Sequence, residues 1–134
     1  MKDAIAEHLR NVDYAVVDCG TVGAASVDYP DFAAAVGLGV VSGQFDRGIL
    51  VCGTGIGMSM AANKIAGIRA AVVHDEKTAV LAAEHNHANV LCLGGRLLSV
   101  PLALGMVELW LTTPFDKRHQ GRLDKIAALE RRGD

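Results

Sequence analysis

Short apolar runs alternate with amphipathic stretches along the chain, and this alternation predicts a regular succession of strands and helices. Four apolar runs have the length of a strand, at residues 14–18, 48–52, 69–73 and 88–93. Apolar residues at helical spacing, with capping residues beside them, predict helices at 2–10, 31–43, 57–64, 75–84, 99–111 and 121–132. Asp31 and Asp75 are expected to cap two of these helices, and His85 is expected to end one.

Apolar strands separated by helices are typical of a parallel sheet that is covered on both faces. We therefore predict a single domain over residues 1–134, with a three-layer, Rossmann-like α/β fold and strands in the flavodoxin-like order. Such a domain usually begins with a strand, whereas this pattern begins with a helix. The first strand is thus missing from the pattern, and in that order it would separate strand 14–18 from strand 48–52.

The glycine-rich stretch after the second predicted strand is the best candidate for chemistry. Cys52 ends the strand, and Gly53, Gly55 and Gly57 follow at every second position before a helix. Glycines let the backbone come close to a bound anion, and the first N–H groups of the helix point to the same place. A thiol beside such donors is favoured as the thiolate. The stretch therefore predicts an oxyanion or phosphate site next to a reactive cysteine.

Three interpretations of this turn remain open from the residues alone. The first is a sugar-phosphate site in which Cys52 is a base. The second is a dinucleotide site, because Gly53-x-Gly55 begins a Gly-x-Gly-x-x-Gly pattern and Asp75 stands where a ribose-binding acid belongs. Met58 replaces the third glycine of that pattern, which counts against the dinucleotide. The third interpretation is a turn that serves packing alone.

Composition narrows the range of partners. A net charge of −2 gives no electrostatic reason to expect nucleic acid or an anionic membrane surface. No apolar run approaches the roughly 20 residues of a transmembrane helix, so we expect a cytoplasmic protein. The three cysteines have no metal-ligand spacing. Cys19 and Cys92 are expected to be buried, reduced thiols, and His87 to be solvated.

Several motifs together resemble the ribose-5-phosphate isomerase B family, which also includes the galactose-6-phosphate isomerase subunits. The resemblance covers about residues 2 to 126 and rests on residues 28–30 (DYP), 52–57 (CGTGIG), 61–70 (AANKIAGIRA), 85–91 (HNHANVL), 94–96 (GGR) and 118–122 (RHQGR).

This resemblance implies an aldose–ketose isomerase that interconverts ribose 5-phosphate and ribulose 5-phosphate through an enediolate, with no metal and no cofactor. Cys52 matches the base, His85 the group that opens the sugar ring, and Thr54 with the turn's backbone the donors to the oxyanion. The residues implied to bind substrate are Gly53, Gly55, Ile56, Gly57, Asn86, Arg96, Arg118 and Arg122.

The resemblance also implies a homodimer or homotetramer with sites at the subunit interface, where His85, Asn86 and Arg96 face the neighbour's turn. The family opens with a strand that ends in an Asp-His pair, and this chain matches it only from the next helix onward. We therefore expect the natural protein to start earlier, and the 134-residue chain alone to have reduced stability and activity. A non-catalytic or hexose-phosphate-specific member of the family is the alternative, and a dinucleotide-dependent oxidoreductase is a more distant one.

Overall fold

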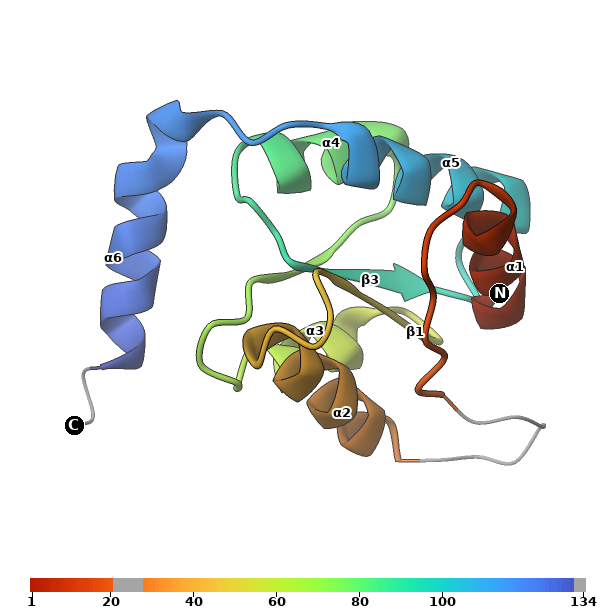
Figure 1. Cartoon of the computed structure of the whole chain (residues 1–134), viewed down its shortest axis with the longest axis horizontal. Coiled ribbons are helices and arrows are strands. Elements are labelled where there is room, and N and C mark those ends of the chain that lie inside the picture. The colour runs from red at the N-terminus through yellow and green to blue at the C-terminus, as the bar shows by residue number, and fades with distance from the viewer. Residues whose placement is uncertain (21–27, 132–134) are drawn as a thin grey trace.

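The computed structural model describes residues 1–20 and 28–131 and has an open parallel sheet between two layers of helices (Figure 1). Its strands are β1 (Gly48–Cys52), β2 (Ala70–Val72) and β3 (Val90–Gly94). The α-helices are α1 (Lys2–Asn11), α2 (Tyr29–Val41), α3 (Ile56–Ala62), α4 (Glu76–Glu84), α5 (Val100–Thr112) and α6 (Gln120–Glu130), and a short 3₁₀ helix η1 (Lys117–His119) precedes α6. The predicted α/β architecture is confirmed.

The two faces of the sheet have separate apolar cores, and β3 contributes to both. Its side chains alternate, so that Val90 and Cys92 pack with α2 and α3, whereas Leu91 and Leu93 pack with α1, α4 and α5. Trp110 of α5 is the largest fully buried side chain of the second core. This two-sided burial explains why the strand is apolar throughout and not alternately polar.

The predicted flavodoxin-like strand order is wrong in one respect. That order would place the strand near residue 50 beside the strand near residue 70, whereas β3 lies between them and the order is β1-β3-β2. The burial of the strands gives the physical reason. All five residues of β3 are buried, which suits a central position, whereas the three residues of β2 are only half-buried, which suits an edge.

The strand predicted at residues 14–18 does not form. The segment is exposed, with Tyr14 at 40% and Val17 at 65%. Local bonds hold it to α1, because Tyr14 N–H donates to the Leu9 carbonyl at 2.9 Å and Arg10 donates to the Val16 carbonyl at 3.4 Å. Among the described residues β1 pairs only with β3. An extended segment becomes a strand only when a neighbour completes its hydrogen-bond ladder, and residues 14–18 have none here.

Two of the three predicted helix ends are confirmed. Asp75 caps α4 in a capping box, accepting the Thr78 N–H at 2.7 Å, and His85 is the C-terminal cap of the same helix. The prediction for Asp31 is wrong, because the N-cap position of α2 is Asp28, whose side chain makes no capping bond, and Asp31 lies in the first turn. Proline fits the first turn of a helix, so the helix begins before Pro30 and not after it.

Helix α6 stands at one side of the molecule, away from the sheet (Figure 1). Leu123 is its one buried residue, whereas Ile126 is 43% exposed and Leu129 59% exposed. One contact near its end is a hydrogen bond from Gly67 N–H to the Glu130 carboxylate at 2.9 Å. In the part of the chain that the structure describes, no helix has the length and apolar character that crossing a bilayer requires.

Candidate active site

Cys52 lies at the carboxyl end of β1, where the backbone turns sharply into α3. Gly55 has a φ of +81°, and its N–H donates to the Cys52 sulfur at 3.1 Å. An N–H aimed at sulfur is the arrangement that stabilises a negatively charged thiolate. The Thr54 hydroxyl oxygen accepts the Ile56 N–H at 3.2 Å, which leaves the hydroxyl proton available to a ligand. The predicted succession of strand, glycine turn and helix is thus confirmed.

A second turn, after β3, is bonded directly to the first. Gly95 N–H donates to the Cys52 carbonyl at 2.7 Å, and Arg96 N–H donates to the Gly53 carbonyl at 3.0 Å. The Arg96 side chain then lies over the glycine turn, since a Cβ on Gly53 would stand 3.3 Å from its Cδ. The structure therefore brings Arg96 together with Cys52, Thr54 and the turn glycines of its own chain, so the expectation that Arg96 faces the neighbour's turn is wrong.

Tyr29 also lies over this turn, although sequence reasoning did not select it. A Cβ on Gly57 would stand 2.6 Å from the Tyr29 ring carbon Cζ and 2.7 Å from its hydroxyl oxygen. Tyr29 is 42% exposed, so its hydroxyl is accessible beside the turn. The available signal was the sequence Asp28-Tyr29-Pro30, which matched the family without indicating a contact.

The cysteines differ in environment. Burial and the neighbouring Cys52 raise the pKa of the Cys92 thiol to about 12, so Cys92 is an inert core residue. Cys52 is half-buried and borders a turn. Cys19 is half-buried as well, so the prediction of a buried thiol is right for Cys92 and wrong for Cys19.

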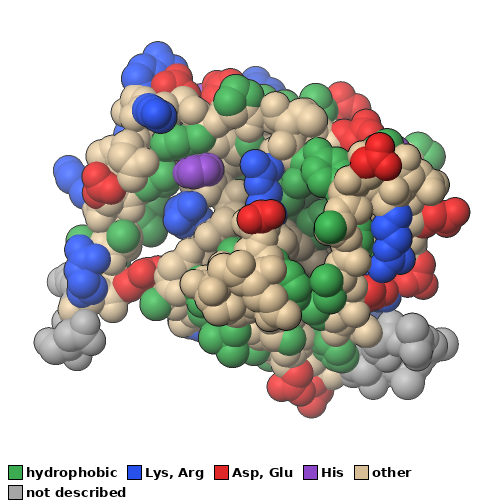
Figure 2. All heavy atoms as spheres, viewed as in Figure 1, with side chains coloured by type: hydrophobic (Ala, Val, Ile, Leu, Met, Phe, Trp, Pro, Cys, Tyr) green, Lys and Arg blue, Asp and Glu red, His purple; other side chains and the backbone are tan. Residues whose placement is uncertain are grey.

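The remaining predicted residues form a second cluster around the end of α4. His85 lies with its ring centroid 4.4 Å from that of His119, and its Nε2 is 3.3 Å from a Glu84 carboxylate oxygen. His119 in turn has its Nδ1 3.4 Å from Arg122 Nη1. On the face drawn in Figure 2, a histidine lies in the hollow between α6 and the rest of the molecule, with basic side chains around it.

Arg118 and Asn86 border the same cluster. Arg118 forms an ion pair with Asp116 at 2.8 Å, and its own N–H donates to that carboxylate at 3.0 Å. These bonds hold the pKa of the Asp116 carboxyl below its usual value. Asn86 follows His85 and is exposed. Sequence reasoning did not select His119, although the Arg118-His119-Gln120 motif contained it.

The two clusters lie at opposite ends of the sheet. Cys52 pairs with Gly94 and Gly48 pairs with Val90, so Cys52 is at the carboxyl end of the strands. His85 ends the helix that leads into the amino end of β3. The four residue steps from Gly48 to Cys52 span about 13 Å. At that separation, Cys52 and His85 of one chain cannot both reach C1 and C2 of the same pentose phosphate molecule. One chain therefore does not bring His85 to Cys52.

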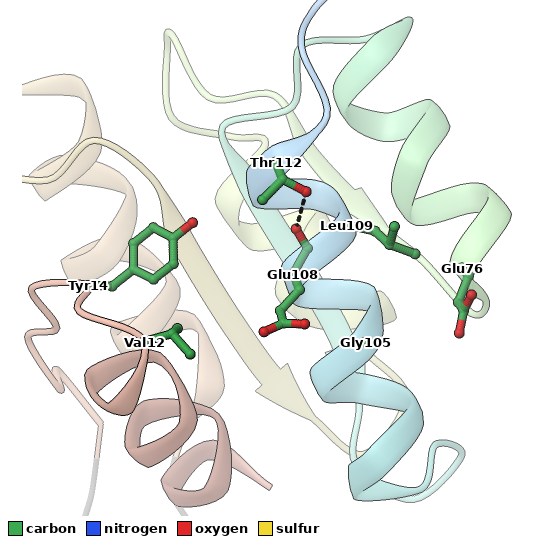
Figure 3. Close-up of a pocket in the computed structure, with 7 residues that line it drawn as sticks. All are labelled: Val12, Tyr14, Glu76, Gly105, Glu108, Leu109 and Thr112. Atoms are coloured by element: carbon green, nitrogen blue, oxygen red, sulfur yellow. Dashed lines mark hydrogen bonds between the residues drawn. The ribbon is translucent and has the colours of Figure 1, made fainter.

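Other features of the surface are separate from both clusters. A groove between the end of α1 and α5 is lined by Tyr14, Glu76, Glu108 and their neighbours, and holds none of the predicted site residues (Figure 3). Over residues 1–20 and 28–131, no three potential metal ligands lie within reach of one ion. Asp75 is occupied as a helix cap, which weakens the dinucleotide interpretation because that interpretation needs a free carboxylate there.

Comparison with known proteins gives one consistent result. A family model described as Ribose/Galactose Isomerase matches residues 1–126. Ribose-5-phosphate isomerase B of Escherichia coli is 44% identical over 98% of this chain and 89% of its own length. The structure of Clostridium thermocellum ribose-5-phosphate isomerase B superposes with a TM-score of 0.96 at 47% identity, covering 98% of this chain and 90% of that one. The Mycoplasma genitalium enzyme, with bound ribulose-5-phosphate, superposes with a TM-score of 0.92 at 45% identity, covering 97% and 88%.

Proposed function

The chain belongs to the ribose/galactose isomerase family, and we propose that it interconverts ribose 5-phosphate and ribulose 5-phosphate by moving a proton between C1 and C2. The observation that carries the proposal is the Cys52 sulfur, which accepts a hydrogen bond from Gly55 N–H at the edge of a glycine turn. The names of the relatives support the same substrate, since one of them was solved with ribulose-5-phosphate.

Cys52 acts as the base in this proposal. Its thiolate takes the proton from C2 of the open-chain aldose, and the electrons of that C–H bond form the C1–C2 double bond of the enediolate. The hydroxyl proton of O2 passes to O1, and the same thiol returns its proton to C1, so that C2 becomes the carbonyl carbon of the ketose. One base beside both carbons is enough, because the carbons are adjacent.

The turn stabilises the negative charge that develops on the sugar oxygens. Backbone N–H groups between Gly53 and Gly57, that of Ile56 included, and the Thr54 hydroxyl are fixed before the substrate arrives, so they need no reorganisation during the reaction. Arg96 adds positive charge above the turn. These groups stabilise the enediolate more than the neutral sugar, which is what accelerates the reaction.

Ring opening and phosphate binding belong to the second cluster. His85 takes the proton of the C1 hydroxyl as the ring C–O bond breaks and delivers it to the ring oxygen, which becomes a hydroxyl group. Arg118 and Arg122 bind the phosphate, because a guanidinium group matches its oxygens with two parallel donors. Asn86 donates to a sugar oxygen.

Because the clusters lie at opposite ends of one sheet, the complete site requires a second copy of the chain. In a two-fold symmetric dimer, the His85 cluster of each protomer faces the Cys52 turn of its partner. The exposed Ile126 and Leu129 of α6 support such a contact, since they are apolar and uncovered in the single chain. We propose a homodimer or homotetramer, and a cytoplasmic setting in which the free thiols remain reduced.

Deuterium exchange tests the base directly. With ribose 5-phosphate in D₂O, NMR should show deuterium entering at C2 with the unsubstituted protein and no exchange with Cys52→Ala. Cys19→Ala is the matched control, because it removes a half-buried free thiol outside the site. Exchange by Cys52→Ala at the unsubstituted rate would contradict the proposed base. Exchange with a hexose 6-phosphate but not with the pentose would favour the hexose-specific alternative.

A further inference from the structure

The segment that carries Arg118 and Arg122 is attached to the molecule at few points. Helix α6 buries only Leu123, and its outer apolar residues are exposed. The position of η1 and of the first turn of α6 therefore depends on the contacts of residues 113–119, which run from the end of α5 through η1. These contacts decide whether the basic residues stand beside His85.

Three contacts join this segment to the end of α4. Asp116 N–H donates to the Glu84 carbonyl at 2.9 Å, and the His119 ring lies against the ring of His85. The third is a stack between Phe115 and His87, whose ring centroids are 4.5 Å apart with only 8° between their planes. Sequence reasoning expected His87 to be solvated; the residue is exposed, but it also stacks on Phe115, which was not expected.

Backbone hydrogen bonds fix the position of His87, on which the Phe115 ring stacks. His87 has a φ of +45°, which turns the chain back after α4, and its carbonyl accepts two bonds from the Arg69 guanidinium at 3.0 and 2.8 Å. Burial lowers the pKa of His87, and the nearby Arg69 and Arg47 lower it further. The ring is thus uncharged near neutral pH, and a neutral imidazole loses less hydration than a cation when it stacks on an aromatic ring.

We propose that His87 and Phe115 are positioning residues, whose stacked rings hold residues 113–119 against α4 so that Arg118 and Arg122 stand beside His85. The inference rests on the proposed function, which gives phosphate binding to the arginines and ring opening to His85. Loss of the stack lowers the fraction of molecules with a docked segment, and the apparent affinity for substrate falls by that fraction. Bound phosphate restores the docked state, so kcat changes less than KM.

Variants of Phe115 separate the stack from simple apolar packing. Phe115→Tyr keeps a flat ring, Phe115→Leu keeps apolar volume without one, and Phe115→Ala removes both. Phe45→Ala is the control, because it removes another half-buried aromatic ring, one that packs on Gly39 away from both clusters. Since an aromatic stack stabilises by an amount that corresponds to about a two- to tenfold change in affinity, KM should rise by that factor in the Ala and Leu variants, with kcat within about twofold.

Hydrogen exchange followed by mass spectrometry gives a readout independent of activity. Amides of residues 113–119 should exchange faster in Phe115→Ala and Phe115→Leu than in the unsubstituted protein, in Phe115→Tyr or in Phe45→Ala, while β3 keeps its protection. Equal exchange in all variants would overturn the proposal. Faster exchange with an unchanged KM would overturn it as well, because the stack would then order the segment without serving the site.

The same experiment distinguishes this inference from the proposed function. If the unsubstituted protein turns over no ribose 5-phosphate, the proposed function fails by itself. The positioning role is then decided by the exchange rates and by the affinity for inorganic phosphate measured by calorimetry. Weaker phosphate binding by Phe115→Ala than by Phe115→Tyr would support the role, and equal binding would overturn it.

Discussion

Replacing Gly55 by alanine should destabilise the protein more than any substitution at a freely exposed glycine. Gly55 has a φ of +81°, and a Cβ there would stand 3.0 Å from the Leu93 carbonyl carbon and 3.0 Å from Val72 Cγ2. The left-handed conformation costs a non-glycine residue about 1–2 kcal/mol. The close contact involves the backbone of the central strand, which cannot move aside, and overpacking of this kind costs about 1–3 kcal/mol more.

The expected total is about 2–5 kcal/mol, which for a domain of this size lowers the melting temperature by roughly 6–15 °C. Gly43→Ala is the matched control, since Gly43 has a φ of +83° and nothing lies within 4 Å of its Cβ position. The free energy of unfolding of Gly43→Ala should fall only by the conformational cost, about 1–2 kcal/mol. Urea unfolding followed by circular dichroism measures both variants. Equal losses for Gly55→Ala and Gly43→Ala would refute the steric part of the reasoning.

Three further predictions follow from single contacts. Cys52→Ser should lower kcat by about 10²-fold or more without changing the melting temperature, because a neutral hydroxyl is a far weaker base than a thiolate. Activity assays and melting curves on the same sample measure the two effects. Asp75→Ala should lower the free energy of unfolding by about 1 kcal/mol through loss of the cap, whereas Asp31→Ala, whose side chain caps nothing, should change it little. Acidification from about pH 7 to pH 5.5 should destabilise the protein partly through His87, because burial lowers its pKa in the folded state and the unfolded chain binds the proton first. The urea midpoint should therefore fall as the pH is lowered, and it should fall less in His87→Asn, since asparagine tolerates the positive φ at this position. The same change of midpoint with pH in both proteins would contradict a contribution from His87.

Local patterns in the sequence were sufficient for most elements. Apolar runs predicted β1, β2 and β3 to within a few residues, and Asp75 identified the start of α4, because these features depend on neighbours in the chain. The central place of β3 was not accessible in the same way. Strand order depends on which apolar face packs on which helix. All three strand sequences are similarly apolar, so the sequence does not indicate which strand is central.

The failed strand at residues 14–18 shows the limit of periodicity. Tyr14 to Asp18 has an apolar pattern suitable for a strand, but strand formation requires a partner, and none is available to it among the described residues. The same limit applies to side-chain contacts between segments. The stack of His87 on Phe115 joins residues 28 positions apart, and no local signal in either segment indicates it.

The candidate site residues were selected by family motifs, and the same resemblance implied that His85 meets Cys52 across a subunit interface. Family motifs selected both Cys52 and His85, and the structure places them at opposite ends of the sheet. Motifs record which residues act together on a substrate, whereas the fold of one protomer shows which residues can meet within it. The difference between the two is the reason to expect a second protomer.

Mixing two inactive variants tests this shared site most directly. Cys52→Ala and His85→Ala chains, each inactive alone, are unfolded together and refolded. In a two-fold symmetric dimer, half of the randomly paired molecules are mixed and carry one intact site of two, so activity should return to about a quarter of the unsubstituted value. If native mass spectrometry shows mixed dimers and no activity returns, Cys52 and His85 do not act across the interface, and the account of the site is wrong.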